Sequence, residues 1–370
     1  MGTGQETSQD TMQDTGQDTM QVLDRVTGIA YNKQEREVLP VERYEPPFTI
    51  TNRMLLMVAG IAEKAGRISG CNAFESRPHL RRNNRIRSIH SSLAIEANSL
   101  SLDEVRSVIG GKTVIGPQKE IQEVKNAYQA YEMLGSFDPF SLEDLKKLHG
   151  VMTFLTVQES GVFRSHNEGV FRGECCIFMA PPPHLVPGQM RDLFDWMQRS
   201  RSEVHPLILS SVFHYEFVFI HPFADGNGRM ARLWQTALLS QWNPVFQYLP
   251  LESRIQEFQD AYYEAIASCH SAGNADAFIV FMLDKISLTL DRALEQASSK
   301  DPYLTAEVQR LLAVMEYDVP YTAAQLMAKL SLKSRDNFRK LYLLPTLERG
   351  LIAMSVPEKP TSRKQAYIRR

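Results

Sequence analysis

Two apolar segments separated by a short glycine-rich break constrain the fold of this chain most strongly. Residues 206–220 and 230–241 carry apolar side chains at helical spacing, which predicts two consecutive helices. The break between them reads His221-Pro-Phe-Ala-Asp-Gly-Asn-Gly-Arg-Met-Ala-Arg232. Gly226 and Gly228 lack a Cβ, so backbone N–H groups can approach an anion there, and the following helix directs its N-terminal N–H groups to the same point. The segment therefore predicts a phosphate cradle.

Charged side chains in this segment supply the groups for phosphate chemistry. Arg229 and Arg232 are three residues apart, hence on one helix face, and can grip phosphate oxygens with forked donors. Asp225 is a candidate Mg²⁺ ligand, because one or two carboxylates commonly hold this ion together with phosphates and water. His221 is the candidate base and Phe223 a buried anchor of the loop. A lone histidine or a Gly-Asn-Gly turn is commonly structural, so only their combination indicates a site.

Residues 221–232 resemble the signature of Fic-domain proteins, His-Pro-Phe-x-(Asp/Glu)-Gly-Asn-Gly-Arg-x-x-Arg, at every defined position. The resemblance spans about residues 44–290 and implies a protein adenylyltransferase, which moves AMP from ATP to a Tyr, Thr or Ser hydroxyl of a protein target, itself included. It implies these roles: His221 as base, Asp225 on Mg²⁺ or Mn²⁺, Gly226, Asn227 and Gly228 on the α- and β-phosphates, Arg229 on the phosphates and Arg232 on the γ-phosphate. The related Doc kinases carry lysine at the second glycine, so Gly228 favours nucleotidyl transfer over phosphorylation.

Two further stretches resemble elements of the same family. Residues 161–187 alternate aromatic or β-branched with polar residues around two glycines, which predicts a β-hairpin. The family's flap, a strand that holds the target backbone, lies at Cys175, Cys176, Ile177 and Phe178. Tyr262 and Tyr263 stand where relatives place a tyrosine pair near the nucleoside. Apolar residues at these spacings are also typical of a core, and both interpretations stay open here.

A built-in brake is predicted N-terminal to the core. Ser92-Leu-Ala-Ile-Glu96-Ala-Asn98 resembles the family's inhibitory motif, (Ser/Thr)-x-x-x-Glu-(Gly/Asn), with Ala97 where glycine is common. Ser92 and Glu96 are four residues apart and share a helix face. A Glu96 carboxylate paired with Arg232 would remove the partner of the γ-phosphate and repel the phosphate itself. We therefore expect the protein to be autoinhibited; the alternative is an exposed helix glutamate.

The fold is predicted to be mainly α, with a Fic-type helical core, a β-hairpin flap and a small C-terminal winged-helix domain. The expected divisions are a disordered low-complexity tail at 1–21, an N-terminal helical region with the inhibitory motif at 22–115, the catalytic core at 116–295, a linker at 296–302 and the winged-helix domain at 303–370. Within the last, residues 323–330 and 335–349 predict two helices around a turn, followed by a strand.

Charge and composition limit the partners. The formal net charge is −2, whereas residues 329–370 carry eleven Lys or Arg against three Asp or Glu, a balance that permits DNA contacts. No apolar run is long enough for a membrane span, and four scattered cysteines suggest a reducing compartment, so we expect a cytoplasmic protein without a membrane partner. DNA and a second copy of the chain stay open as partners, beside ATP and the protein target.

Several sequence features are expected to carry no chemistry. Gly110-Gly-Lys-Thr113 lacks the first glycine of a P-loop and predicts a turn at a helix end. His149, His205 and His214 show no metal-ligand spacing, and the basic run 81–87 is expected to be a solvated helix face. The alternative functions are removal of AMP by hydrolysis, with Glu96 placing a water, a bifunctional enzyme, and a nucleotide-sensing DNA-binding regulator.

Overall fold

The structure is a computed structural model that describes most, but not all, of the chain. The described residues are 21–23, 30–32, 38–39, 43–70, 78–172, 175–298, 305–315, 319–348, 351–360, 362 and 365–369. Apart from Gln21, the predicted tail at 1–21 lies outside them, as do residues 299–302 of the predicted linker.

The N-terminal unit, residues 1–45, contains a small antiparallel sheet that the sequence analysis did not foresee. Its strands β1 (Gln21–Leu23), β2 (Ala30–Asn32) and β3 (Val38–Leu39) are ordered β1-β2-β3. Tyr31 is in register with Val22 on one side and Val38 on the other. Aromatic and β-branched residues favour strands, and these apolar runs are too short for a helical period. Within the region predicted to be helical from residue 22, the described residues 22–23, 30–32 and 38–39 are therefore strands.

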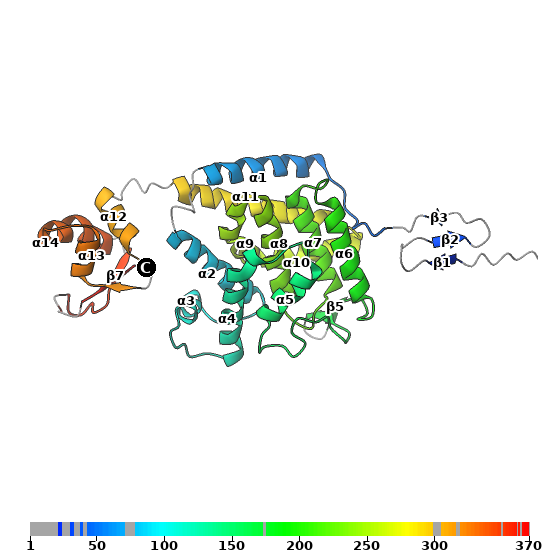
Figure 1. Ribbon diagram of the computed structural model, residues 1–370, viewed down its shortest axis with the longest axis horizontal. Helices are drawn as coiled ribbons and strands as arrows, with labels where there is room; N and C mark the ends of the chain where they lie inside the picture. The colour runs from blue at the N-terminus through cyan, green and yellow to red at the C-terminus, as the bar shows by residue number, and fades with distance from the viewer. Residues whose placement is uncertain are drawn as a thin grey trace, which may run out of the picture. The chain divides into compact units, whose positions relative to one another are not determined.

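The second unit begins at Pro46, and its body is helical, which confirms the predicted fold class (Figure 1). Extended residues near Pro47 lead into it. Its long helices are α1 (Asn52–Gly70), α2 (Pro78–Ile95), α3 (Leu102–Ile109), α4 (Gln118–Met133), α5 (Leu142–Met152), α6 (Val186–Ser200), α7 (Pro206–Ile220), α8 (Asn227–Trp242), α9 (Leu251–Glu257), α10 (Gln259–Ala272) and α11 (Asp276–Ser298). Within the described residues, no helix has the length and apolar character needed to cross a bilayer.

The helices α7 and α8 form the centre of this body and hold the motif between them (Figure 1). In α7, 12 of 15 residues are buried, and in α8, 13 of 16. Such helices are buried on nearly all faces by their neighbours. Helix α7 packs against α6 and α11 as well as against α8. The loop from His221 to Gly226 connects two buried helices, and because both of its ends are held by packing, its conformation is restricted.

The predicted β-hairpin is present before α6. Strands β4 (Gly169–Arg172) and β5 (Cys175–Met179) pair antiparallel, with an irregularity between Val170 and Phe171. They form a two-stranded sheet, so each strand has one edge without a strand partner among the described residues.

Gly110 and Gly111 end α3 in a turn, as predicted, with a φ of 73° at Gly111.

A buried carboxyl group ties three helices together beneath the site. Glu252 on α9 is 1% exposed and accepts hydrogen bonds from Ser88 Oγ on α2 at 2.7 Å and from Tyr131 O–H on α4 at 2.6 Å. Buried polar groups are tolerated only when they are hydrogen-bonded, so this set fixes α2 against α4 and α9. Helix α2 is the helix that leads to Glu96.

The small C-terminal domain contains helices, an antiparallel sheet and a core of its own. It comprises α12 (Ala306–Val314), β6 (Pro320–Tyr321), α13 (Ala323–Lys329), a helix made of α14 (Arg335–Asn337), η3 (Phe338–Leu343) and α15 (Leu344–Glu348), and strands β7 (Ile352–Met354) and β8 (Tyr367–Arg369). The antiparallel sheet has the order β6-β8-β7. Leu311, Leu326 and Phe338 are at most 1% exposed at its centre. Helix α11 continues to Ser298, so residues 296–298, which were predicted as linker, are helical.

Replacing Tyr131 with Phe should lower the free energy of unfolding by about 1–3 kcal/mol, because Glu252 would keep only Ser88 as a buried donor. Urea denaturation followed by tryptophan fluorescence measures this loss. Tyr128→Phe on the same helix is the control, since no hydrogen bond of the Tyr128 hydroxyl is found among the described residues. Equal stability of the two variants would contradict the assigned role of Tyr131.

Candidate active site

The loop that precedes α8 is shaped by two left-handed residues. His221 ends α7 with a φ of 51°, and Gly226 precedes α8 with a φ of 84°. Helix α8 begins at Asn227, three residues earlier than the sequence spacing indicated, so Gly228 and Arg229 lie in its first turn. The unpaired N–H groups of this turn and the positive end of the helix dipole are directed at the loop.

Asn227 and Phe223 hold the loop from inside. The Phe223 N–H donates to Asn227 Oδ1 at 2.9 Å, and Asn227 Nδ2 donates to the Phe223 carbonyl at 2.7 Å. The carboxamide of Asn227 is therefore occupied within the loop, which leaves its backbone N–H for an anion. Phe223 is fully buried, as predicted, and stacks on the His149 ring at 3.6 Å between centroids.

His149 on α5 is a positioning residue that the sequence analysis set aside. Its Nε2–H donates to the Asp225 carbonyl at 2.9 Å, and its Nδ1 accepts from the Gly161 N–H at 2.9 Å. Burial lowers the pKa of His149 to about 4, so the ring is neutral and keeps both roles at neutral pH. The signal was its helical spacing from Leu145, which places it on the buried face of α5.

His221 has the protonation state that a base requires. Its Nδ1–H donates to the Val218 carbonyl at 3.3 Å, which leaves the lone pair on Nε2. Burial lowers the pKa of His221, although the Val218 carbonyl and nearby carboxylates oppose this, and the ring is neutral near pH 7.

Arg164, a second residue missed from the sequence, clamps the loop to the hairpin region. It is 2% exposed and donates Nε to the His221 carbonyl at 2.7 Å and a terminal nitrogen to the Pro181 carbonyl at 2.5 Å. Its own N–H donates to the Pro222 carbonyl at 2.9 Å. No local pattern marks this arginine, because its partners are distant in the sequence.

Asp225 and Arg229 pair with each other at the mouth of the loop. Asp225 Oδ1 accepts from Arg229 Nη2 at 2.8 Å and from the Gly226 N–H at 2.5 Å. Burial opposes ionisation, but the charge and hydrogen bond of Arg229, the Gly226 N–H and Lys119 together lower the pKa of Asp225. An ionised, 41% exposed carboxylate whose Oδ2 has Lys119 at 3.9 Å as its sole charged partner among the described residues fits one protein ligand of Mg²⁺.

The structure brings Ser92, Glu96 and Arg232 together across 136 and more residues of sequence. Arg232 Nη2 donates to Glu96 Oε1 at 2.7 Å and to the Ser92 carbonyl at 2.9 Å, and its Nε donates to Ser92 Oγ at 3.1 Å. The arginine is 2% exposed, so its charge is compensated almost entirely by these contacts.

The Glu96 carboxylate also fills the cradle beside Gly228. A Cβ at Gly228 would lie 2.2 Å from Glu96 Oε1 and 3.1 Å from Arg232 Nη1. Only glycine allows this approach. The place next to the first backbone turn of α8, where an anion would bind, is thus taken by the acid itself.

Glu96 does not lie within α2 but directly after it. The helix ends at Ile95, and Ala97 turns the chain with a φ of 63°, a left-handed conformation that disfavours residues with a Cβ. This gives a physical reason for glycine at the corresponding position of the family motif.

The two tyrosines differ in environment. Tyr262 is 2% exposed, and its O–H donates to His214 Nε2 at 3.0 Å, while His214 Nδ1–H donates to Gln235 Oε1 at 2.6 Å. Tyr263 is 42% exposed beside it. Of the flap residues, the side chain of Phe178 is described and stacks on His270 at 4.2 Å; those of Cys175, Cys176 and Ile177 lie outside the described part.

Comparison with known proteins bears on this geometry. The Fic/DOC family model matches residues 139–239, and the model described as "Filamentation induced by cAMP protein Fic-like, C-terminal domain" matches residues 306–368. The crystal structure of a Fic family protein from Desulfovibrio desulfuricans G20 is 42% identical, with a TM-score of 0.67, over 88% of this chain and 98% of that one. The chain belongs to the Fic/DOC family.

Curated members of the Fic family are more distant. Protein adenylyltransferase fic-1 of Caenorhabditis elegans is 26% identical over 295 residues, 74% of this chain and 56% of the relative. Protein adenylyltransferase Fic of Nematostella vectensis is 30% identical over 216 residues, 56% of this chain and 48% of the relative. The chain spans about half the length of the curated Fic relatives it matches.

Replacing Ala97 with Gly should raise the free energy of unfolding by about 1 kcal/mol, because glycine adopts the left-handed conformation without the Cβ penalty. Chemical denaturation measures the gain. Ala94→Gly, three residues earlier inside α2, should instead lose about 0.5–1 kcal/mol. A loss of stability in both variants would count against a strained Ala97.

The depressed pKa of His149 predicts a pH dependence of stability. The unfolded chain takes up a proton near pH 6.5 that folded His149 takes up only near pH 4, so the free energy of unfolding falls as pH falls through this window. His149→Gln should reduce this slope by about 1.4 kcal/mol per pH unit. Urea titrations between pH 4 and 6.5 measure the slope, and an unchanged slope in His149→Gln would contradict this assignment.

Proposed function

We propose that this Fic protein transfers AMP from ATP to a Tyr, Thr or Ser hydroxyl of a protein, itself among the targets, and that Glu96 keeps it inhibited. One observation carries this most: Glu96 Oε1 occupies the glycine cradle while holding the buried Arg232 at 2.7 Å. A carboxylate that binds an arginine at a helix N-terminus occupies the kind of site that a phosphate group would occupy. The names of the curated relatives, protein adenylyltransferases, support the same reaction class.

In the proposed reaction, the target hydroxyl oxygen attacks the α-phosphorus of ATP, the bond to the bridging oxygen breaks, and pyrophosphate leaves. His221 Nε2, which carries the free lone pair, takes the hydroxyl proton. The backbone N–H groups of Asn227 and Gly228, and that of Gly226 once Asp225 Oδ1 turns away from it, bind phosphate oxygens, and Arg229 and Arg232 bind the rest of the polyphosphate. Mg²⁺, held by Asp225, would neutralise phosphate charge during the transfer.

The hairpin is the proposed docking strand for the target. An edge of the β4–β5 sheet without a strand partner can pair with an extended segment of another chain. Arg164 links the His221 carbonyl to Pro181, directly after this hairpin, so a segment bound there would be held in register with the base. We assign Tyr263, exposed beside Tyr262, to the nucleoside side of the site.

The test is incorporation of labelled AMP from ATP and Mg²⁺ into the protein itself. Glu96→Gly should raise incorporation by about tenfold or more, since the loss of one charge-assisted contact corresponds to about 1.5–3 kcal/mol. Adding His221→Ala to that variant should abolish it. Exposed Glu63→Gly, a glycine introduced in α1, is the matched control and should leave incorporation at the wild-type level. No incorporation by Glu96→Gly would refute the transferase.

The position of Glu96 also favours a second reaction, hydrolysis of AMP from a modified protein. A carboxylate at the cradle, 37% exposed, can orient a water toward the α-phosphorus. Target protein modified by Glu96→Gly, purified and then incubated with the wild type, separates the two. Loss of AMP with the wild type but not with Glu96→Gly assigns hydrolysis to Glu96, whereas retention with both restricts Glu96 to inhibition.

A further inference from the structure

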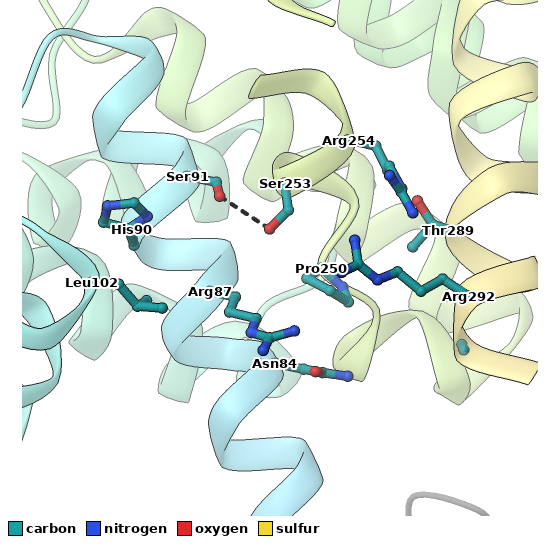
Figure 2. A pocket seen from close by; sticks show the side chains of 11 residues that line it. Asn84, Arg87, His90, Ser91, Leu102, Pro250, Ser253, Arg254, Thr289 and Arg292 are labelled. Carbon is teal, nitrogen blue, oxygen red and sulfur yellow. Dashed lines mark hydrogen bonds between the residues drawn. The ribbon is translucent and has the colours of Figure 1, made fainter. Parts of the chain in front are cut away.

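A cavity of about 300 Å³ is lined by residues of α2, α3, α9 and α11 and by Pro250 (Figure 2). Three arginines contribute to its lining, Arg87 from α2, Arg254 from α9 and Arg292 from α11. Figure 2 shows the side chains of Arg87 and Arg292 reaching from opposite helices toward the same space. None of the residues in the proposed transfer mechanism lines this cavity.

The cavity has positive charge without matching negative charge. No Asp or Glu is among its lining residues. Arg254 is paired with Glu257, but Arg87 and Arg292 have no ion pair with any residue that the structure describes. Burial, together with the charges of Arg292 and Arg106, lowers the pKa of Arg87. Both guanidinium groups are exposed to solvent, which screens their repulsion, and an anion between them would be attracted to both.

The basic run 81–87, expected to be a solvated helix face, is in more than one environment. Arg81 lies over the Tyr248 ring at 5.3 Å, and Arg85 is paired with Glu132. Arg87 is the member of the run that lines the cavity. Arg82 and Arg87 are exposed, as expected, whereas Arg81 and Arg85 are half-buried, so only part of the run is a solvated face.

Polar groups of the wall complete a site for an oxyanion. Ser91 Oγ and Ser253 Oγ lie 3.0 Å apart, so one of the two hydroxyls donates a hydrogen bond to the other. The hydroxyl that accepts keeps its own proton, which can be donated to a third group. His90, whose pKa burial lowers, adds a neutral ring to the lining. Forked guanidinium donors with hydroxyl donors between them match the tetrahedral oxygens of a phosphate.

We propose that this cavity is a second ligand site, separate from residues 221–232, that binds a small phosphate-bearing anion between Arg87 and Arg292. Its volume is at the lower end of ligand sites, which suits pyrophosphate or a nucleoside monophosphate and excludes a large cofactor. The bound anion would join α2 to α11 and so stabilise the position of α2. This site does not depend on the proposed transfer reaction.

Calorimetric titration of the full-length protein with inorganic pyrophosphate, and separately with AMP, tests the site. The double variant Arg87→Gln/Arg292→Gln should bind the tighter of the two anions at least tenfold more weakly, since each arginine supplies charge-assisted hydrogen bonds. Arg82→Gln removes the same charge from an exposed position of α2 and should change the affinity less than threefold. Arg229→Gln, which weakens the cradle, should also leave this binding in place.

Thermal unfolding gives a second readout. Without anion, the double variant should melt at the wild-type temperature or above it, because repulsion between the two arginines is removed; with anion, only the wild type should gain several degrees. The proposal is overturned if neither anion binds the wild type at millimolar concentration, if the double variant binds as tightly as the wild type, if Arg229→Gln alone removes the binding, or if the unliganded double variant melts several degrees lower.

Discussion

The buried charge of Arg232 is the constraint on which the rest of the site depends. A guanidinium that is 2% exposed must be compensated, because an unpaired charge inside a protein costs several kcal/mol. In this chain Glu96 and Ser92 compensate the charge. The conformation of Arg232 therefore depends on the C-terminal end of α2 as well as on residues 221–232. A polyphosphate would satisfy the same cation. Under the proposed function, Glu96 and a polyphosphate would exclude each other at Arg232, because both would use the space at Gly228 that Glu96 occupies here.

Local spacing was enough to predict much of this arrangement. Two apolar helical runs and the glycines between them determine where α7 and α8 meet, and the Glu96–Arg232 pairing follows from the family resemblance of two short motifs. His149 and Arg164 could not be found in this way, because they act on backbone carbonyls 76 and 57 residues away. Every residue has a backbone carbonyl, whatever its side chain, so a hydrogen bond to a carbonyl leaves no pattern in the sequence. Only the burial of His149 on the apolar face of α5 was visible in advance.

Other differences arise where one residue type serves several environments. The carboxamide of Asn227 closes the loop on Phe223, which local sequence cannot distinguish from a contact with phosphate. The arginines of α2 were expected to form one solvated face, and Arg82 and Arg87 are exposed, but tertiary neighbours give Arg81 an aromatic contact and Arg85 an ion pair. The strands between Gln21 and Leu39 are two or three residues long, shorter than a periodicity can reveal.

The turn at Ala97 determines how much of the molecule must move when Arg232 changes partner. Glu96 stands one residue beyond the end of α2, held by hydrogen bonds from Glu96, Ala97 and Asn98 N–H groups to the Leu93 and Ala94 carbonyls. Two turns before Glu96, Ser88 of the same helix donates a hydrogen bond to Glu252 of α9, which holds the body of α2 in place. Withdrawal of the carboxylate then needs only the fraying of a helix terminus, a nanosecond-to-microsecond motion, and no displacement of a packed helix.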